Sequence, residues 1–432
     1  MSNFATRDVA QRAREASFAL AASAAELRNA ALLAAANALE ARAQEIFAAN
    51  ARDMEKAQAD GLAAPSLKRL KFDEGKLKSV CAGLRDLAAM DDPIGRVQLK
   101  TELADGLILT RVACPMGVVG VIFESRPDAL VQIAGLCIKS GNAVLLKGGR
   151  EALCSNEILF ETMERAAVAA GLPEGFMGLL TSREEVAQML ALDDLIDLII
   201  PRGSNAFVRY IMDNSRIPVL GHSDGVCHLY LDAACDAQMA ARIAVDAKTQ
   251  YVAACNSIET LLVHKDAAQH ALPVVAAALH VAGVRLRTDA RAQALIPGIP
   301  CEAAQQSDWT AEYSDKILAI KIVDSIDEAI AHINRFGSHH TDAIVTNDDL
   351  AAAKFASLVD SAGVYRNCST RFADGYRYGF GAEVGIATGK LHARGPMGLE
   401  GLCSYKYLLH GSGDIVADFA GGKRAFTHKK LK

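Results

Sequence analysis

An alternation of apolar, strand-like runs with helical segments constrains the fold of this chain more than any other feature of its sequence. Between Val118 and Asn214, short apolar runs alternate with amphipathic segments, and the same alternation begins again at Cys227 and continues to Asn367. Strands that are apolar throughout are typical of parallel sheets, in which helices form the crossovers. We therefore predict an α/β protein with two doubly wound parallel-sheet domains.

Two further kinds of segment flank these series. Residues 3–96 are rich in alanine and leucine without sustained heptads, which favours a helical layer on a larger domain over a coiled coil. Residues 101–113 alternate polar with apolar residues and turn at Asp105-Gly106, as a β-hairpin does. The glycine-rich residues 369–406 predict a long functional loop, and residues 405–409 a last short strand.

Composition excludes several classes of function. The chain has 432 residues, of which 51% are hydrophobic, and a net charge of -5 that gives no reason to expect a nucleic-acid partner. No apolar run is long enough to span a bilayer, and the acidic residues near the N-terminus argue against a signal or transit peptide. The ten cysteines form no CxxC pair, and most lie in apolar stretches, as reduced cysteines do. We expect a cytoplasmic protein with no metal site, in which His222 and His228 orient loops.

Standard nucleotide-binding motifs are missing. There is neither a GxGxxG after the first parallel strand nor a Walker A sequence. The better candidate is Lys147-Gly148-Gly149-Arg150, because it follows the second parallel strand at the edge where α/β sheets bind ligands. Two cations beside two glycines suit a phosphorylated ribose, although an ordinary basic turn would look the same.

Cys255 is the candidate nucleophile. It is expected in a tight connection between a helix over residues 236–249 and a buried strand over residues 258–263, beside Asn256 and Ser257. Catalytic side chains are often held on short loops between rigid elements. The alternative is a buried small hydrophobic residue, since three apolar residues precede Cys255.

Taken together, these residues resemble the aldehyde dehydrogenase superfamily. The resemblance includes the segment 141–147, the turn Pro201-Arg202-Gly203-Ser204, Cys255 and Glu312, in their order and spacing. Longer stretches resemble one family within it, the γ-glutamyl phosphate reductases (glutamate-5-semialdehyde dehydrogenases) of proline biosynthesis. These stretches are residues 123–127, 221–228, 367–372 and 390–400, and the whole resemblance extends from about residue 5 to about residue 415.

The resemblance implies a role for each candidate residue. Cys255 matches the nucleophile, with Ser125 and Asn256 as further catalytic candidates. Lys147 matches the lysine that contacts the adenosine ribose, and Glu312 the glutamate that holds the nicotinamide ribose. The remaining cofactor-binding candidates are Gly148, Arg150, Gly203 and Ser204. Arg150 stands where relatives selective for the unphosphorylated cofactor carry an acid, which favours NADPH over NADH.

Two departures from the hydrolytic aldehyde dehydrogenases bear on the reaction. Ser125 replaces the asparagine that stabilises the oxyanion, so a hydroxyl and the Cys255 backbone N–H would have to serve. The stretch 221–225 lacks the glutamate that activates water. Both departures fit reduction of L-glutamyl 5-phosphate to L-glutamate 5-semialdehyde and phosphate through a Cys255 thioester. Arg126 and Arg371 are candidates for the substrate phosphate or α-carboxylate, unless they form structural salt bridges.

Two other functions remain open. A hydrolytic aldehyde dehydrogenase acting on another small aldehyde is disfavoured by the missing glutamate. A catalytically silent scaffold that only binds nucleotide is disfavoured by the joint presence of Cys255, Lys147 and Glu312.

The resemblance also implies the domain organisation. An NADP-binding domain would comprise residues 1–100 and 114–226 with a late segment near 350–370, and a catalytic domain residues 227–350. Residues 101–113 and 372–415 would form an oligomerisation flap whose strands pair across subunits of a homodimer or homotetramer. Functional coupling to glutamate 5-kinase is a further expectation.

Overall fold

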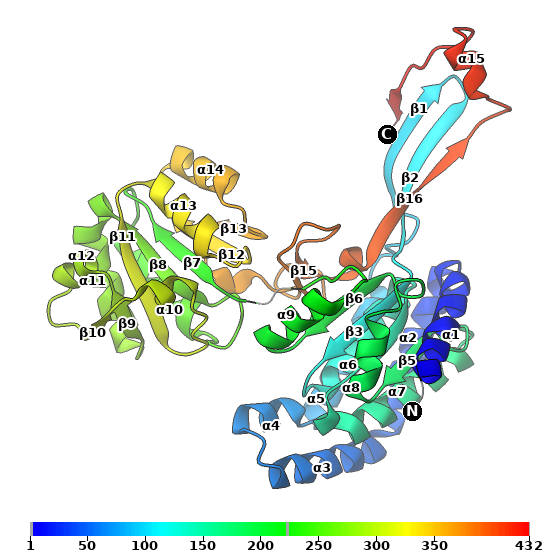
Figure 1. The fold of residues 1–432 in the computed structure, drawn as a ribbon, viewed down its shortest axis with the longest axis horizontal. Coiled ribbons are helices and arrows are strands. Elements are labelled where there is room, and N and C mark those ends of the chain that lie inside the picture. Colours follow the sequence, from blue (N-terminus) through cyan, green and yellow to red (C-terminus); the bar gives the residue numbers. More distant parts are fainter. Residues whose placement is uncertain (1–2, 222–223, 432) are drawn as a thin grey trace.

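The computed structural model describes residues 3–221 and 224–431, which contain two parallel sheets, a four-stranded antiparallel sheet and a two-stranded antiparallel ribbon. Figure 1 shows the two parallel-sheet units side by side, with the antiparallel sheet projecting from them. The predicted fold, an α/β protein of aldehyde dehydrogenase type with two parallel sheets and a small β flap, is confirmed.

The N-terminal unit is a four-stranded parallel sheet of order β5-β4-β3-β6 covered by helices. Its strands are β3 (Val118–Phe123), β4 (Ala143–Lys147), β5 (Met177–Leu180) and β6 (Leu198–Arg202). The helices between and after them are α6 (Pro127–Lys139), α7 (Leu153–Ala169), α8 (Arg183–Met189) and α9 (Asn205–Asn214). The chain begins with α1 (Asn3–Ala21), α2 (Ala25–Ala41), α3 (Ala43–Ala59), α4 (Ala64–Leu70) and α5 (Glu74–Ala89). The helical layer predicted for residues 3–96 is therefore present.

One glycine explains how closely that layer packs on the sheet. A Cβ at Gly135 in α6 would lie 2.5 Å from Leu84 Cδ2 of α5, so a larger residue would push the two helices apart. Leu32 of α2, Leu84 and the strand residue Val121 belong to one buried apolar cluster. This core gives the carboxyl edge of the sheet a rigid support.

The second unit is a seven-stranded sheet of order β10-β9-β11-β8-β7-β12-β13. Its strands are β7 (Cys227–Leu231), β8 (Ile258–His264), β9 (Arg285–Thr288), β10 (Cys301–Ala303), β11 (Ile317–Val323), β12 (Thr341–Val345) and β13 (Gly363–Arg366). Its helices are α10 (Ala237–Thr249), α11 (Lys265–Val281), α12 (Ala290–Leu295), α13 (Ile326–Phe336) and α14 (Asp349–Leu358), with 3-10 turns η2 (Gln306–Thr310) and η3 (Thr370–Phe372).

The late segment near residues 350–370 was expected in the N-terminal unit but belongs to the second unit. Its strand β13 pairs in parallel with β12, with Thr341 opposite Gly363, so α14 and β13 complete the seven-stranded sheet. Pairing of this kind continues the βα alternation in the same sheet, which is the simplest continuation of the chain.

The third sheet is antiparallel, with the order β16-β2-β1-β17. Its strands are β1 (Val97–Ala104), β2 (Leu107–Pro115), β16 (Cys403–His410) and β17 (Lys429–Leu431), and α15 (Val416–Ala420) lies between the last two. The hairpin turns at Gly106, whose φ of 75° favours glycine. The hairpin and β16 pair with one another within the chain, where pairing across subunits was expected.

The flap is also smaller than predicted, because most of residues 372–415 lie elsewhere. β14 (Gly385–Ala387) and β15 (Gly395–Met397) form a separate two-stranded ribbon, followed by the turn η4 (Leu399–Leu402). Met397, Leu399 and Leu402 belong to the apolar core of the N-terminal unit. Of the predicted late flap segment, only residues from Cys403 onward extend the hairpin.

Candidate active site

Cys255 lies in the short connection between α10 and β8, as the sequence predicted. The connection is a pair of tight turns, in which Ala254 N donates to Tyr251 O and Ser257 N donates to Ala254 O over 2.8 Å. Cys255 is partly exposed, whereas Cys137 in the core is fully buried. The partial exposure argues against the alternative that Cys255 is a buried hydrophobic residue.

A buried ion pair fixes both ends of this connection. Lys248 at the end of α10 lies 2.5 Å from the carboxylate of Glu259 in β8, and both side chains are at most 1% exposed. Burial raises the pKa of Glu259 to about 7, while the nearby Lys248 ammonium opposes that rise. Because an unpaired buried charge costs several kcal/mol, the pair holds the helix end and the strand start together.

Asn256 anchors the same loop to the segment that follows β13. Its Nδ2 donates to Ala373 O over 2.8 Å, and its backbone carbonyl accepts from Thr370 Oγ1 over 2.6 Å. Asn256 is 3% exposed. The structure therefore gives this catalytic candidate a role in positioning the Cys255 loop.

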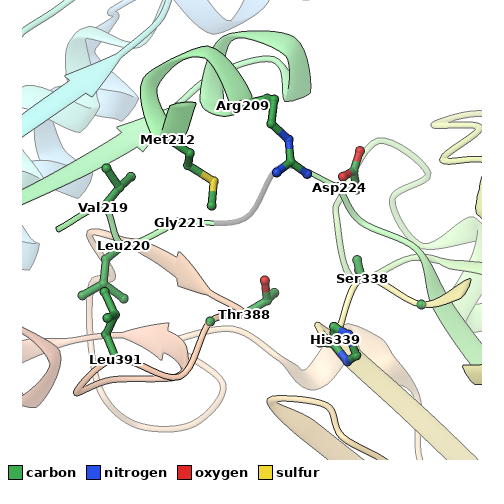
Figure 2. A pocket seen from close by; sticks show the side chains of 12 residues that line it. Arg209, Met212, Val219, Leu220, Gly221, Asp224, Ser338, His339, Thr388 and Leu391 are labelled. Atoms are coloured by element: carbon green, nitrogen blue, oxygen red, sulfur yellow. The ribbon is translucent and has the colours of Figure 1, made fainter. Parts of the chain in front are cut away.

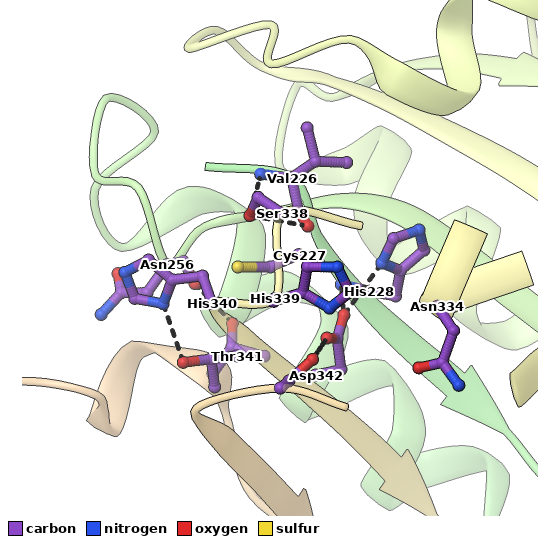
Figure 3. Close-up of polar contacts among 12 residues, drawn as sticks. Val226, Cys227, His228, Asn256, Asn334, Ser338, His339, His340, Thr341 and Asp342 are labelled. Atoms are coloured by element: carbon purple, nitrogen blue, oxygen red, sulfur yellow. Dashed lines mark hydrogen bonds and ion pairs between the residues drawn. The ribbon is translucent and has the colours of Figure 1, made fainter. Parts of the chain in front are cut away.

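His340 contacts the Cys255 thiol. Its Nε2 lies 3.2 Å from Cys255 Sγ, and its Nδ1 lies 2.9 Å from Thr341 Oγ1. Figure 3 shows His340 beside the Cys227 and Asn256 region, with its bond to Thr341 drawn. His340 is 1% exposed.

Gly225 brings Glu312 to the same loop. A Cβ built on Gly225 would lie 2.5 Å from Cys255 Cα and 2.7 Å from Glu312 Oε1. Glu312 Oε2 accepts a hydrogen bond from Asn205 Nδ2, 2.7 Å away, at the start of α9. The nucleophile, the cofactor-binding candidate Glu312 and the N-terminal unit therefore meet at a position that only glycine fits.

Of the two arginine candidates for substrate binding, Arg371 interacts electrostatically with Cys255. Arg371 is 9% exposed, and its Nε donates to Gln250 Oε1 over 2.9 Å, while its terminal nitrogens have no bonded partner in the described chain. Burial lowers the pKa of Arg371, and the nearby Cys255 opposes this shift. Arg126 instead forms an ion pair with Asp128 at 2.9 Å, which is the structural role left open above.

A third arginine was not among the candidates. Arg202 is the last residue of β6 and pairs with Phe123 of β3. Phe123 lies two residues before Ser125 in the sequence. Burial and the neighbouring Arg126 lower the pKa of Arg202, while Glu383 and Cys255 oppose that shift. The region around the thiol therefore carries positive charge suited to an anionic substrate.

Ser125 points toward a different partner. Both its backbone N–H and its hydroxyl donate to Glu151 Oε1, over 2.7 Å and 2.6 Å. Its φ of 33° is unusual for a residue with a side chain, and the two hydrogen bonds to one carboxylate oxygen hold the backbone in this conformation. The hydroxyl donates to Glu151 in this arrangement and is not available as an oxyanion donor.

The cofactor-binding candidates gather at the carboxyl edge of the N-terminal sheet. Lys147 pairs with Ile122 on one side and Leu180 on the other, and chiefly burial lowers its pKa. Gly203 and Ser204 precede α9, whose N-terminus presents backbone N–H groups suited to a diphosphate. Arg150 is exposed at the same edge. Their positive charges and backbone N–H groups suit a ligand that carries phosphate groups.

The two glycines after Lys147 are closely surrounded by neighbouring side chains. A Cβ on Gly148 would lie 2.1 Å from Asn156 Nδ2, and one on Gly149 would lie 2.0 Å from Glu151 Oε1. A residue with a side chain at either position would therefore displace its neighbours.

Other polar features lie apart from Cys255. His228 is buried and bonds Asp342 over 2.9 Å, and His222 lies outside the described residues. Among residues 3–221 and 224–431, no group of three or more metal-ligating side chains comes together, and no helix could cross a membrane. A cavity of about 350 Å³ between α9 and residues 337–339 contains none of the candidate site residues in its lining (Figure 2).

Comparison with known proteins agrees with this geometry. The model of the aldehyde dehydrogenase family matches residues 3–296. The chain is 55% identical over 424 residues to the γ-glutamyl phosphate reductase of Pelotomaculum thermopropionicum, covering 98% of this chain and 97% of that one. It superposes on the crystal structure of γ-glutamyl phosphate reductase from Thermotoga maritima with a TM-score of 0.92 and 36% identity, over 95% and 99% of the two chains. This chain belongs to the γ-glutamyl phosphate reductase family.

Membership makes the chain an oxidoreductase with an aldehyde dehydrogenase fold. A more distant match is glyceraldehyde-3-phosphate dehydrogenase from Methanocaldococcus jannaschii in complex with NADP, with 16% identity, a TM-score of 0.66 and 95% of each chain covered. At that identity the match supports the fold alone.

For this member of the γ-glutamyl phosphate reductase family, sequence reasoning missed the side chains that come from distant elements. His340 lies 85 residues after Cys255, and Asn205 lies 107 residues before Glu312. The available signal was the pair His339-His340 immediately before β12, since Cys255 likewise precedes β8 and the amino ends of parallel strands meet at one edge of a sheet.

Proposed function

We propose that this protein reduces L-glutamyl 5-phosphate to L-glutamate 5-semialdehyde and phosphate with NADPH, the second step of proline biosynthesis from glutamate. Its family and the names of its relatives support this substrate. The observation that carries the proposal is the position of Cys255, which is partly exposed, within 3.2 Å of His340 and beside Glu312 at Gly225.

Residues of both units would hold NADPH. Lys147 and Glu312 would bind the two riboses, and Gly203 with Ser204 would place the N-terminus of α9 against the diphosphate. Arg150 would bind the 2′-phosphate through its guanidinium. Bound NADPH supplies a hydride to the acyl carbon held on Cys255.

Cys255 acts first as a nucleophile. Its sulfur attacks the γ-carbonyl carbon of the acyl phosphate, and the C–O bond to phosphate breaks to leave a thioester. The Cys255 backbone N–H would stabilise the oxyanion of each tetrahedral species. After reduction, the hemithioacetal collapses to the aldehyde and the electron pair of the C–S bond returns to sulfur.

Arg371 is the stronger of the two substrate-binding candidates. Its terminal nitrogens are free to form two parallel hydrogen bonds with a phosphate or carboxylate, whereas Asp128 already pairs with Arg126. Because Arg371 is almost buried, its charge acts in a medium less screened than water. We assign Arg371 to the substrate phosphate and Arg126 to a more peripheral contact.

The reverse reaction tests this proposal. With glutamate 5-semialdehyde, NADP reduction should continue only when inorganic phosphate is present, because phosphate releases the acyl group from Cys255. Replacement of Cys255 by alanine should abolish turnover and leave NADPH binding, measured by fluorescence, unchanged. Sustained NADP reduction without phosphate would instead favour a hydrolytic aldehyde dehydrogenase, and turnover by the Cys255→Ala variant would refute the thioester.

A further inference from the structure

The environment of His340 distinguishes it from the other histidines of the described chain. It reaches Cys255 Sγ with Nε2 at 3.2 Å and Thr341 Oγ1 with Nδ1 at 2.9 Å, and it is 1% exposed. Its neighbour His339 turns the other way, because its Nδ1 lies 2.5 Å from Asp360 O and its ring lines the cavity of Figure 2. Two adjacent histidines therefore serve opposite sides of the same strand end.

We propose that His340 is a catalytic residue that takes the proton of the Cys255 thiol and passes it to the departing phosphate, and that Thr341 is the positioning residue that sets its tautomer. This inference rests on the proposed thioester chemistry. It adds the proton-transfer group that the sequence around Cys255 lacks.

One tautomer of His340 presents a base to the thiol, and the bond to Thr341 is compatible with it. When Nδ1–H donates to Thr341 Oγ1, the lone pair lies on Nε2 and faces the thiol. A hydroxyl that accepts from the far nitrogen also fixes the plane of the ring. The arrangement has the form of a nucleophile, a base and a group that orients the base.

The proton balance follows from this arrangement. The thiol S–H bond breaks as its proton moves to Nε2, and sulfur bonds to the acyl carbon as phosphate leaves. The imidazolium then protonates the leaving phosphate oxygen, which restores neutral His340. Collapse of the hemithioacetal later leaves Cys255 as a thiolate, which takes one proton from solvent through His340, so one proton is consumed per turnover.

Other ionisable groups lie near this pair. Arg202 from β6 and Arg371 from η3 both interact electrostatically with Cys255. Cys227 of β7 donates to Cys255 O over 3.3 Å. Burial raises the pKa of the Cys227 thiol, and the charges of Asp342 in β12 and Glu259 in β8 add to that rise. Glu312 and Cys255 both lie against Gly225, so the Glu312 carboxylate is also near the Cys255 loop. None of these groups contacts Cys255 Sγ as a proton acceptor. Among the described residues, His340 is therefore the only base in direct contact with the thiol.

Alkylation of Cys255 by iodoacetamide tests the inference without substrate or cofactor. The rate would be followed by peptide mass spectrometry, because the chain has ten cysteines. In His340→Asn and His340→Gln, the rate near neutral pH should fall about tenfold, and its midpoint should move to higher pH by about one unit or more. Thr341→Val should shift the midpoint in the same direction by a smaller amount, and kcat of the His340 variants should fall by a factor of about 100 or more.

His339→Asn is the matched control and should leave the alkylation profile unchanged. Circular dichroism and thermal unfolding would confirm that each variant is folded. An unchanged alkylation rate and midpoint in folded His340→Gln would overturn the inference. Because alkylation needs neither glutamyl phosphate nor NADPH, this result is independent of whether the proposed substrate is correct.

Discussion

At the scale of single residues, Gly225 controls the geometry of the candidate site more tightly than any charged group. A Cβ atom added at Gly225 would lie 2.5 Å from Cys255 Cα and 2.7 Å from Glu312 Oε1. A methyl group placed there must displace either the nucleophile or the proposed ribose ligand. This constraint acts through backbone proximity, which no spacing in the sequence reveals.

We therefore expect Gly225→Ala to lower kcat by at least about tenfold, since small displacements of a reacting group are costly. Overpacking should also lower the free energy of unfolding by about 1–3 kcal/mol. Steady-state kinetics and urea unfolding measure the two effects. Gly389→Ala is a matched control because its Cβ meets nothing within 4 Å. Wild-type kcat in Gly225→Ala would show that the close approach is not needed.

At the scale of elements, the strands were predictable where one chain segment determined them. Residues 143–147, 177–180, 227–231 and 317–323 form strands, and the mostly apolar character of each marks burial on both faces. Ser182 and Glu185 form a capping box at the start of α8. At the start of α13, Ser325 Oγ accepts from Glu328 N, while the Glu328 carboxylate accepts from Asp324 N. Short edge elements such as β9, β10 and α12 were missed because they carry too few buried residues to form a pattern.

Helix α13 contains a buried histidine that should make the protein sensitive to acid. His332 is 4% exposed and packs against Phe336, Trp309 and His228. Within residues 3–221 and 224–431, neither of its ring nitrogens has a hydrogen-bond partner. Burial, aided by His228, lowers its pKa from 6.5 to about 3. The unfolded chain therefore binds a proton at His332 at a higher pH than the folded protein does.

Stability should consequently fall as the pH falls from about 6.5 toward 3, by up to about 4–5 kcal/mol at the lower end. Above pH 6.5 the residue is neutral in both states and contributes no pH dependence. Urea unfolding at a series of pH values should show a shallower loss for His332→Leu than for the wild type. His280→Leu, at an exposed position of α11, should retain the wild-type slope. Identical slopes for all three proteins would contradict this account of His332.

At the scale of the whole molecule, the fold was predictable and the assignment of segments to its parts was not. The two βα series determine two parallel sheets, but nothing local determines which sheet β13 joins or where residues 384–402 pack. The same limit applies to the candidate site. Cys255 was found from its own loop, whereas His340, Asn205 and Arg202 were not, because only the assembled sheets bring them close.

The antiparallel sheet leaves an apolar edge that we propose joins subunits. β16 is the end strand of that sheet in the described chain, and Tyr405, Tyr407 and Leu409 are about half exposed on it. An uncovered edge strand of this kind is a site for pairing with another chain. Leu409→Asp should therefore lower the mass measured by light scattering, whereas Leu350→Asp on the exposed face of α14 should not. A wild-type protein that is monomeric at all concentrations would exclude this role for the flap.

The central claim is that Cys255 carries the glutamyl group, and rapid-quench peptide mass spectrometry tests it most directly. Enzyme mixed with L-glutamyl 5-phosphate in the absence of NADPH should carry one glutamyl group on the peptide that contains Cys255, and addition of NADPH should remove it. A turning-over enzyme with no adduct on Cys255, or with the adduct on one of the other nine cysteines, would contradict the account.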